Sequence, residues 1–257
     1  MRKTILKALS LALLLPAFFM SCEADDEPAG LHSDASDSEF HTKVEFTETV
    51  NGISYYYFGD WPQTLIADGV TVDESVSLKM GGFTYYKGSD DSWYAKAVYN
   101  GNNETNLPSG IKVQPGEPKY FKVEPIKWRK LSDSYNGGSL LFAESVLTGG
   151  IEFYGSQNNR FFGDDENDWQ KYVDPCNYKY SNVRAYLNGI KNQFITDGGN
   201  INDENRNYNI DWSGKGFLQS AFTEGAQDLI LKTKVDNSEE STYGAYHDYY
   251  GRYCADT

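Results

Sequence analysis

Three histidines, three cysteines and 37 acidic residues are the side chains with which this chain could do acid–base, nucleophilic or metal chemistry. Their spacing matches none of the arrangements that such chemistry usually needs. The sequence holds no HExxH pair for zinc, no Cys/His metal spacing and no Ser-His-Asp order. It also lacks a glycine-rich phosphate loop before a helix. We therefore expect neither a metallohydrolase nor a serine hydrolase nor a nucleotide-binding enzyme, and no cofactor.

Carboxylates concentrate in the run DDEND, where Asp164, Asp165 and Asp168 offer the oxygen ligands that Ca²⁺ prefers. The run lacks the alternating spacing of a calcium loop, so a solvated loop is the preferred interpretation and the calcium site a weak candidate. A carboxylate pair for glycoside hydrolysis stays open, because 37 acids put no constraint on the pairing.

Aromatic residues are the other chemical resource, with 20 Tyr, 14 Phe and 5 Trp that often stand side by side. In a strand, neighbouring side chains point to opposite faces, so one of each adjacent pair can face solvent and stack on a sugar or contact a protein. The candidate ligand-binding residues are Trp61, Trp93, Tyr94, Trp128, Arg129 and Arg184.

Each candidate also has a structural interpretation, which we favour. The aromatics would form core and cross-strand pairs. Arg129 would point away from Trp128, and both Arg129 and Arg184 would clamp carboxylates.

Length and charge narrow the class of protein. The chain has 257 residues and a formal net charge of −14. This length allows one domain or two small ones with a sizeable core. So acidic a chain would repel phosphate, so we expect no nucleic-acid partner.

Residues 1–22 read as an export signal. Arg2, Lys3 and Lys7 precede an apolar stretch that is too short to span a bilayer comfortably, and Ser21-Cys22 follows. This order resembles a bacterial lipobox, in which the cysteine thiol is acylated, although Phe19 and Met20 depart from its usual residues. We predict lipidation of Cys22; the alternative is cleavage after Ala24. The lipid would be the membrane contact of an exported envelope protein.

A small, acidic segment follows at residues 23–42, and we expect it to be a flexible tether. The two remaining cysteines, Cys176 and Cys254, form an even pair in an exported protein. A disulfide between them is one possibility and two free buried thiols the other.

The remainder predicts an α+β fold with an antiparallel, β-rich sheet and two short helices. Residues 43–116 form a β-rich region with turns at Asn51-Gly52 and Asp68-Gly69, and the GDWPQT segment after Phe58 is expected to break a strand. In residues 117–257, apolar and polar residues alternate over 120–131, which predicts a strand. Pro125 interrupts the alternation and indicates a bulge or an edge position. We expect the core residues of this strand to be Phe121, Val123, Ile126, Trp128 and Leu131.

The two helices carry their own signals. The first is expected over 182–191 with Ser181 as its cap, and the second over 224–232 with Thr223 as its cap. The inward residues are expected to be Val183, Tyr186, Leu187, Ile190, Ala226, Leu229 and Ile230.

Four segments in order carry a resemblance to a known family: FGDWPQT (58–64), VEPIKWRKL (123–131), YSNVRAYLN (180–188) and GFLQSAFTEGAQDLI (216–230). Together they resemble domain of unknown function 6273, a family of exported proteins abundant in Treponema-type spirochaetes and gut Clostridia. The resemblance covers residues 53–257. It implies a lipoprotein of the outer membrane or cell surface.

The resemblance also raises an expectation about the end of the chain. Family members continue with a further strand and a Trp/Arg-rich segment, which is similar to C-type-lectin and formylglycine-generating-enzyme folds. This chain stops at Thr257 without them. A truncated domain with an open apolar sheet edge is the expectation.

On these grounds we expect a ligand-binding or interaction module for a glycan or a protein. Two alternatives stay open: an exported hydrolase that acts on glycans or proteins through carboxylates, and a non-functional truncated paralogue.

Overall fold

The computed structural model describes residues 32–34, 40–106, 111–135, 137–149, 151, 178–199 and 211–232. Cys22, Cys176 and Cys254, and the acidic run with Asp164, Asp165 and Asp168, lie outside these residues. Within the described residues, no helix is long and apolar enough to cross a bilayer.

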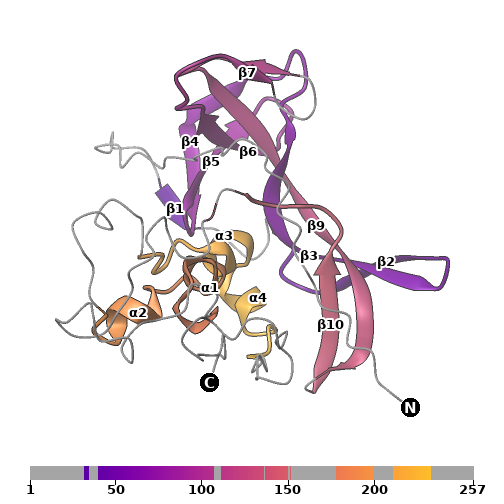
Figure 1. Cartoon of the computed structure of the whole chain (residues 1–257). Helices are drawn as coiled ribbons and strands as arrows, with labels where there is room; N and C mark the ends of the chain where they lie inside the picture. The colour runs from indigo at the N-terminus through magenta and orange to yellow at the C-terminus, as the bar shows by residue number, and fades with distance from the viewer. Residues whose placement is uncertain are drawn as a thin grey trace.

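One eight-stranded sheet dominates the fold (Figure 1). Along its main path the order is β1-β4-β5-β6-β9-β3-β2, and β10 pairs with β9. Every pairing is antiparallel except β1 with β4. The strands are β1 (His32–Asp34), β2 (Glu45–Val50), β3 (Ile53–Leu65), β4 (Val72–Met80), β5 (Phe83–Gly88), β6 (Trp93–Val98), β9 (Pro118–Tyr135) and β10 (Gly138–Ala143). The mainly antiparallel, β-rich α+β class predicted from the sequence is confirmed.

The predicted turns join these strands. Asn51 and Gly52 both have positive φ, 50° and 79°, as a two-residue hairpin turn between β2 and β3 requires. Gly69 also has a positive φ, between β3 and β4. A small separate pair, β7 (Thr105–Asn106) with β8 (Lys112–Val113), follows β6.

The prediction that GDWPQT breaks a strand is wrong. β3 runs through this segment and absorbs its irregularity as two register shifts against β9, between Tyr57 and Asp60 and between Pro62 and Thr64. Pro125 lies opposite Asp60, so the bulge expected at this proline is confirmed, but within a central strand instead of an edge.

Short helices form a layer beside the lower part of the sheet (Figure 1). They are the 3-10 helix η2 (Tyr178–Tyr180) and the α-helices α1 (Asn182–Asn188), α2 (Gln193–Thr196), α3 (Phe217–Ala221) and α4 (Glu224–Gln227). Ser181 and Thr223 cap α1 and α4 as predicted, since each side chain accepts a hydrogen bond from a backbone N–H inside its helix.

The number and length of the helices were predicted wrongly and their apolar faces only in part, since Tyr186 and Ala226 are buried as predicted. The described residues contain four short α-helices instead of two. α1 ends early because Gly189 closes it in the left-handed conformation. Leu187, Leu229 and Ile230 are exposed, and Ala185 takes an inward place that was not predicted.

The core lies in two clusters, of which the larger joins the sheet to the helices. Phe58, Trp61, Ile126, Phe222 and Ala226 form the larger one, with Trp128 against it. Leu78, Met80, Tyr85 and Ala95 form the other. Ile126 is buried as predicted, but Leu131 is 56% exposed.

The end of the expected tether belongs to the folded part. The ring of Phe40 lies 6.1 Å from that of Tyr85, and His41 is hydrogen-bonded to Asp60. Earlier in the same segment, β1 pairs with β4. The sequence prediction of a flexible tether to residue 42 therefore extends too far.

Candidate binding surface

The strands β2, β3, β9 and β10 present two chemically different faces, because side chains alternate along each strand. Tyr56 and Trp128 are register partners on one face. There Trp128 stacks on Phe222 of the helical layer and donates its Nε1–H to the Phe58 carbonyl at 2.7 Å. We call this the inner face. The neighbouring residues of each strand point the other way, to what we call the outer face.

The outer face is defined by Tyr55, Tyr57, Lys127, Arg129 and Phe142. The register across three strands aligns them: Arg129 lies opposite Tyr55 on one side and Phe142 on the other, and Lys127 lies opposite Tyr57. Residues that are directly opposite in an antiparallel sheet stand close together on the same face. The outer face is therefore a row of aromatic and cationic side chains that crosses β3, β9 and β10.

Carboxylates of the chain itself pair with both cations. The Nζ of Lys127 lies 2.6 Å from Glu48 and 4.6 Å from the centre of the Tyr55 ring. Arg129 donates to both oxygens of Glu144, at 2.6 and 2.5 Å. These hydrogen bonds raise the pKa of Lys127 and of Arg129 and lower the pKa of Glu144. An anionic ligand would have to displace these carboxylates, so the outer face does not offer free positive charge.

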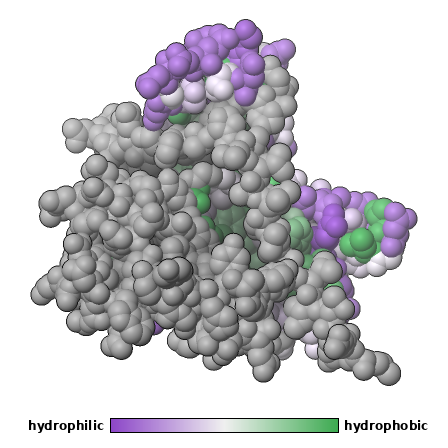
Figure 2. Space-filling view, viewed as in Figure 1, coloured by the Kyte–Doolittle hydropathy of each residue, from purple (hydrophilic) through white to green (hydrophobic). Residues whose placement is uncertain are grey.

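Exposed apolar side chains lie on the strands that form the outer face, some of them, such as Phe46, on the opposite side of their strand. Phe46 is 60% exposed and Phe142 48% exposed, and Val44, Val50 and Leu131 are also exposed. Figure 2 shows hydrophobic residues on the projection that β2 forms with the start of β3, beyond the helical layer. Grouped apolar exposure of this kind marks interaction sites more often than scattered single residues do.

The residues that the sequence predicted for ligand binding lie at different places in the structure and do not form one site. Trp61 and Tyr94 are buried and present no surface to a ligand. Trp93 lies under Lys87, 4.7 Å from Nζ to the ring centre, on β6. Trp128 lies on the inner face, and only Arg129 belongs to the outer face. Arg129 pairs with a carboxylate as predicted.

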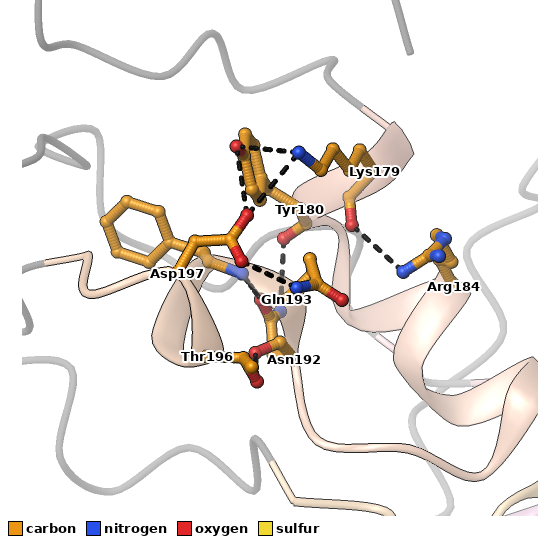
Figure 3. A network of polar contacts seen from close by, with 8 residues as sticks. Lys179, Tyr180, Arg184, Asn192, Gln193, Thr196 and Asp197 are labelled. Atoms are coloured by element: carbon orange, nitrogen blue, oxygen red, sulfur yellow. Dashed lines mark hydrogen bonds and ion pairs between the residues drawn. The ribbon is translucent and has the colours of Figure 1, made fainter. Parts of the chain in front are cut away.

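Arg184 clamps a carbonyl instead of a carboxylate. Its Nη1 donates to the Lys179 carbonyl at 3.4 Å (Figure 3). In the same polar network, Asn192 donates to the Tyr180 carbonyl at 3.0 Å and caps α2, and Asp197 accepts from Gln193 at 2.7 Å. This network joins η2, α1 and α2 to one another, which is a structural role.

Comparison of the chain with protein-family models, with curated proteins and with solved structures finds no match. The resemblance to domain of unknown function 6273 therefore stays a prediction.

The residues that carry this resemblance have structural roles in the described part of the chain. The first two segments pair with each other across β3 and β9. Trp61 donates its Nε1–H to the Leu147 carbonyl at 2.6 Å, and Gln63 donates to the Glu124 and Pro125 carbonyls. The third and fourth segments form α1, α3 and α4, and α3 packs against α1, α4 and β3.

His41 and Asp60 form a pair that sequence reasoning missed. Asp60 is 4% exposed, and burial raises its pKa. Its Oδ1 lies 2.8 Å from Nδ1 of His41, whose ring stands edge-on to Tyr57 of the outer face at 6.2 Å. No local pattern joins residues so far apart in the sequence. Within the described residues, no group of three or more His, Cys, Asp or Glu side chains could hold a metal ion.

Proposed function

We propose that the protein is an exported, lipid-anchored interaction module whose outer face binds a partner protein. The observation that carries the proposal is the aligned row of Tyr55, Arg129 and Phe142, with exposed apolar side chains around it. Tyr, Phe and Arg are enriched at the centres of protein interfaces, where one buried anchor can dominate the affinity.

Two features favour a protein partner over a glycan. Exposed side chains on the strands of the outer face, such as Phe142 and Leu131, are apolar and offer no hydrogen bond to a sugar hydroxyl. The cations are already engaged by Glu48 and Glu144, so they serve as a polar rim around apolar contacts.

The test is binding of the full chain to a peptide array and a glycan array, read with matched variants. Tyr55→Ala and Phe142→Ser remove outer-face contacts, and Val76→Ser removes an exposed apolar side chain on β4 as the control. Saturable peptide binding that both outer-face variants weaken about tenfold, and the control does not, supports the proposal. The proposal would be overturned if the chain bound only glycans, or if Val76→Ser alone lost peptide binding.

Membrane anchoring through Cys22 is part of the same proposal, and its support is the lipobox-like order at the N-terminus. The resemblance points to the outer membrane or cell surface. Expression with labelled palmitate tests the anchor: the wild-type chain should be labelled and Cys22→Ser should not. An unlabelled wild-type chain would contradict it.

The finer fold assignment also belongs to this proposal. A lectin-like or formylglycine-generating-enzyme-like domain is suggested by analogy with the resembled family. The mainly antiparallel sheet with short helices on one side is compatible with it. An experimental structure of the full chain tests the assignment.

The second candidate function is a hydrolase that acts on glycans or proteins through carboxylates. It is favoured by Asp60, a buried carboxylate with a raised pKa that contacts His41 at the border of the outer face. Turnover of a glycan or peptide panel, lost in Asp60→Asn while the fold persists, would favour the enzyme over the binding module.

A further inference from the structure

β2 is the last strand in the order of the sheet. It pairs with β3 on one side, and no strand pairs with its other edge in the part of the chain that the structure describes. A free edge presents backbone N–H and C=O groups in the spacing of a strand, and another extended chain can pair with them. No proline or lysine lies within β2, although both commonly protect an edge from such pairing.

The register of β2 divides its side chains by chemistry. Glu45 and Glu48 lie opposite Tyr57 and Tyr55, on the outer face, because a register shift between Phe46 and Glu48 brings both glutamates to one side. Phe46 lies opposite Tyr56, on the inner face, and the two rings stand edge to face at 5.7 Å. A strand added at this edge would therefore meet acidic groups on one face and an exposed aromatic ring on the other.

From this arrangement we propose that β2 binds, by strand addition, an extended segment of a partner protein in which basic and apolar residues alternate. Basic residues would face Glu45 and Glu48, where they would compete with Lys127 for the Glu48 carboxylate, and apolar residues would face Phe46. The proposal rests on the protein-binding role above and names the chemistry of the partner.

Charge decides against a second copy of this chain as the occupant. Two β2 strands side by side would bring four glutamates together between chains that each carry a net charge of −14. Such repulsion is part of how natural edges avoid self-pairing. A basic segment turns the same charges into attraction.

The experiment uses the full chain and a fluorescent peptide of alternating lysine and valine, as long as the six residues of β2. A second peptide has the same side chains but a methyl group on every backbone nitrogen. Fluorescence anisotropy should show saturable binding of the first peptide, weakened by salt. The methylated peptide should bind at least about tenfold more weakly, because it cannot donate the backbone hydrogen bonds of a strand.

Glu48→Gln and Glu104→Gln are the matched variants, since each glutamate is exposed and pairs with a lysine, Lys127 or Lys112. Glu48→Gln should weaken binding roughly threefold and Glu104→Gln should not. Equal binding of both peptides, or self-association of the chain without peptide binding, would overturn the proposal. If peptides from the array bind through the outer face and their binding does not change when their backbone nitrogens are methylated, the strand-addition proposal fails while the proposed function stands. If no peptide binds at all, both fail.

Discussion

His41 and Asp60 are joined by two hydrogen bonds that occupy both oxygens of one buried carboxylate. The backbone N–H of His41 donates to Oδ2 at 2.6 Å, and its ring Nδ1 lies 2.8 Å from Oδ1. The His41 carbonyl in turn accepts from the Gly59 N–H at 2.9 Å. The pair thus fixes the chain before β2 against the middle of β3.

This pair predicts a specific pH dependence of stability. Burial raises the pKa of Asp60 above 3.8, the bonds from His41 offset this in part, and Glu45 adds to the rise. The stability that protonated Asp60 contributes is full below pH 3.8 and is lost as pH rises through the folded-state pKa. Urea unfolding of wild type and Asp60→Asn should show the wild type losing free energy of unfolding relative to the variant over this rise.

The variant itself serves as the control for the titrating groups that do not contact Asp60, which both proteins share. A difference that stays flat with pH, or that grows in favour of the wild type as pH rises, would contradict a raised pKa of Asp60.

Gln63 predicts a second effect on stability. Its Nε2 donates to two carbonyls of β9, those of Glu124 at 3.0 Å and Pro125 at 3.1 Å, where the proline interrupts the pairing of the strands. Gln63→Leu leaves both carbonyls without this donor and should lower the free energy of unfolding by about 1–3 kcal/mol. Gln114→Leu loses an exposed hydrogen bond from the same atom type to Glu104, so it should change stability by less than about 0.5 kcal/mol. Equal losses in urea unfolding would refute the role of Gln63.

The hairpin turn at Asn51-Gly52 could be predicted from the sequence, whereas the contacts of Gln63 with β9 could not. Asn51-Gly52 determines its hairpin through its own backbone preferences, so the pattern was sufficient. GDWPQT contains the same kinds of local signals, yet β3 continues through it by pairing with the distant strand β9 across two register shifts, and Gln63 of β3 donates to the Glu124 and Pro125 carbonyls of that strand. Local patterns do not contain such long-range partners.

For the candidate surface too, local patterns predicted what happens within one strand but not between strands. The alternation of side chains along β9 predicted that Arg129 points away from Trp128. Only the register across β3, β9 and β10 shows that Arg129 meets Tyr55 and Phe142. His41 gave no signal, because its partner is far away and its neighbours read as a tether. Periodicity predicted Leu131 and Leu229 as core residues, but both are exposed, because periodicity does not show how far the neighbouring elements that would bury them extend.

A disulfide between Cys176 and Cys254 is a third prediction, made from the even number of cysteines that remain if Cys22 carries a lipid. Thiol titration of the mature, unreduced protein in denaturant should then find no free thiol. Cys254→Ser should expose one thiol, which is the positive control for the titration. Two titratable thiols in the wild type would rule the disulfide out.

A fourth prediction concerns Gly216, which lies where α1 and α3 approach each other closely. It precedes α3 with φ −77°, a conformation open to any residue, yet a Cβ there would collide with the Tyr186 carbonyl and the backbone of Gly189. Backbone atoms at the end of α1 cannot move aside as a flexible side chain can. Gly216→Ala should therefore lower the free energy of unfolding by about 1–3 kcal/mol through overpacking.

Gly149→Ala is the matched control, because a Cβ at Gly149 meets nothing within 4 Å. Both variants restrict the unfolded chain equally, an effect that stabilises by up to about 1 kcal/mol where the folded backbone tolerates alanine. The difference between the two in urea unfolding therefore reports the crowding at Gly216 alone. If Gly216→Ala proves as stable as Gly149→Ala, the third and fourth sequence segments do not pack as closely as α1 and α3 do here, and the explanation of the glycine in GFLQSAFTEGAQDLI by contact with α1 is wrong.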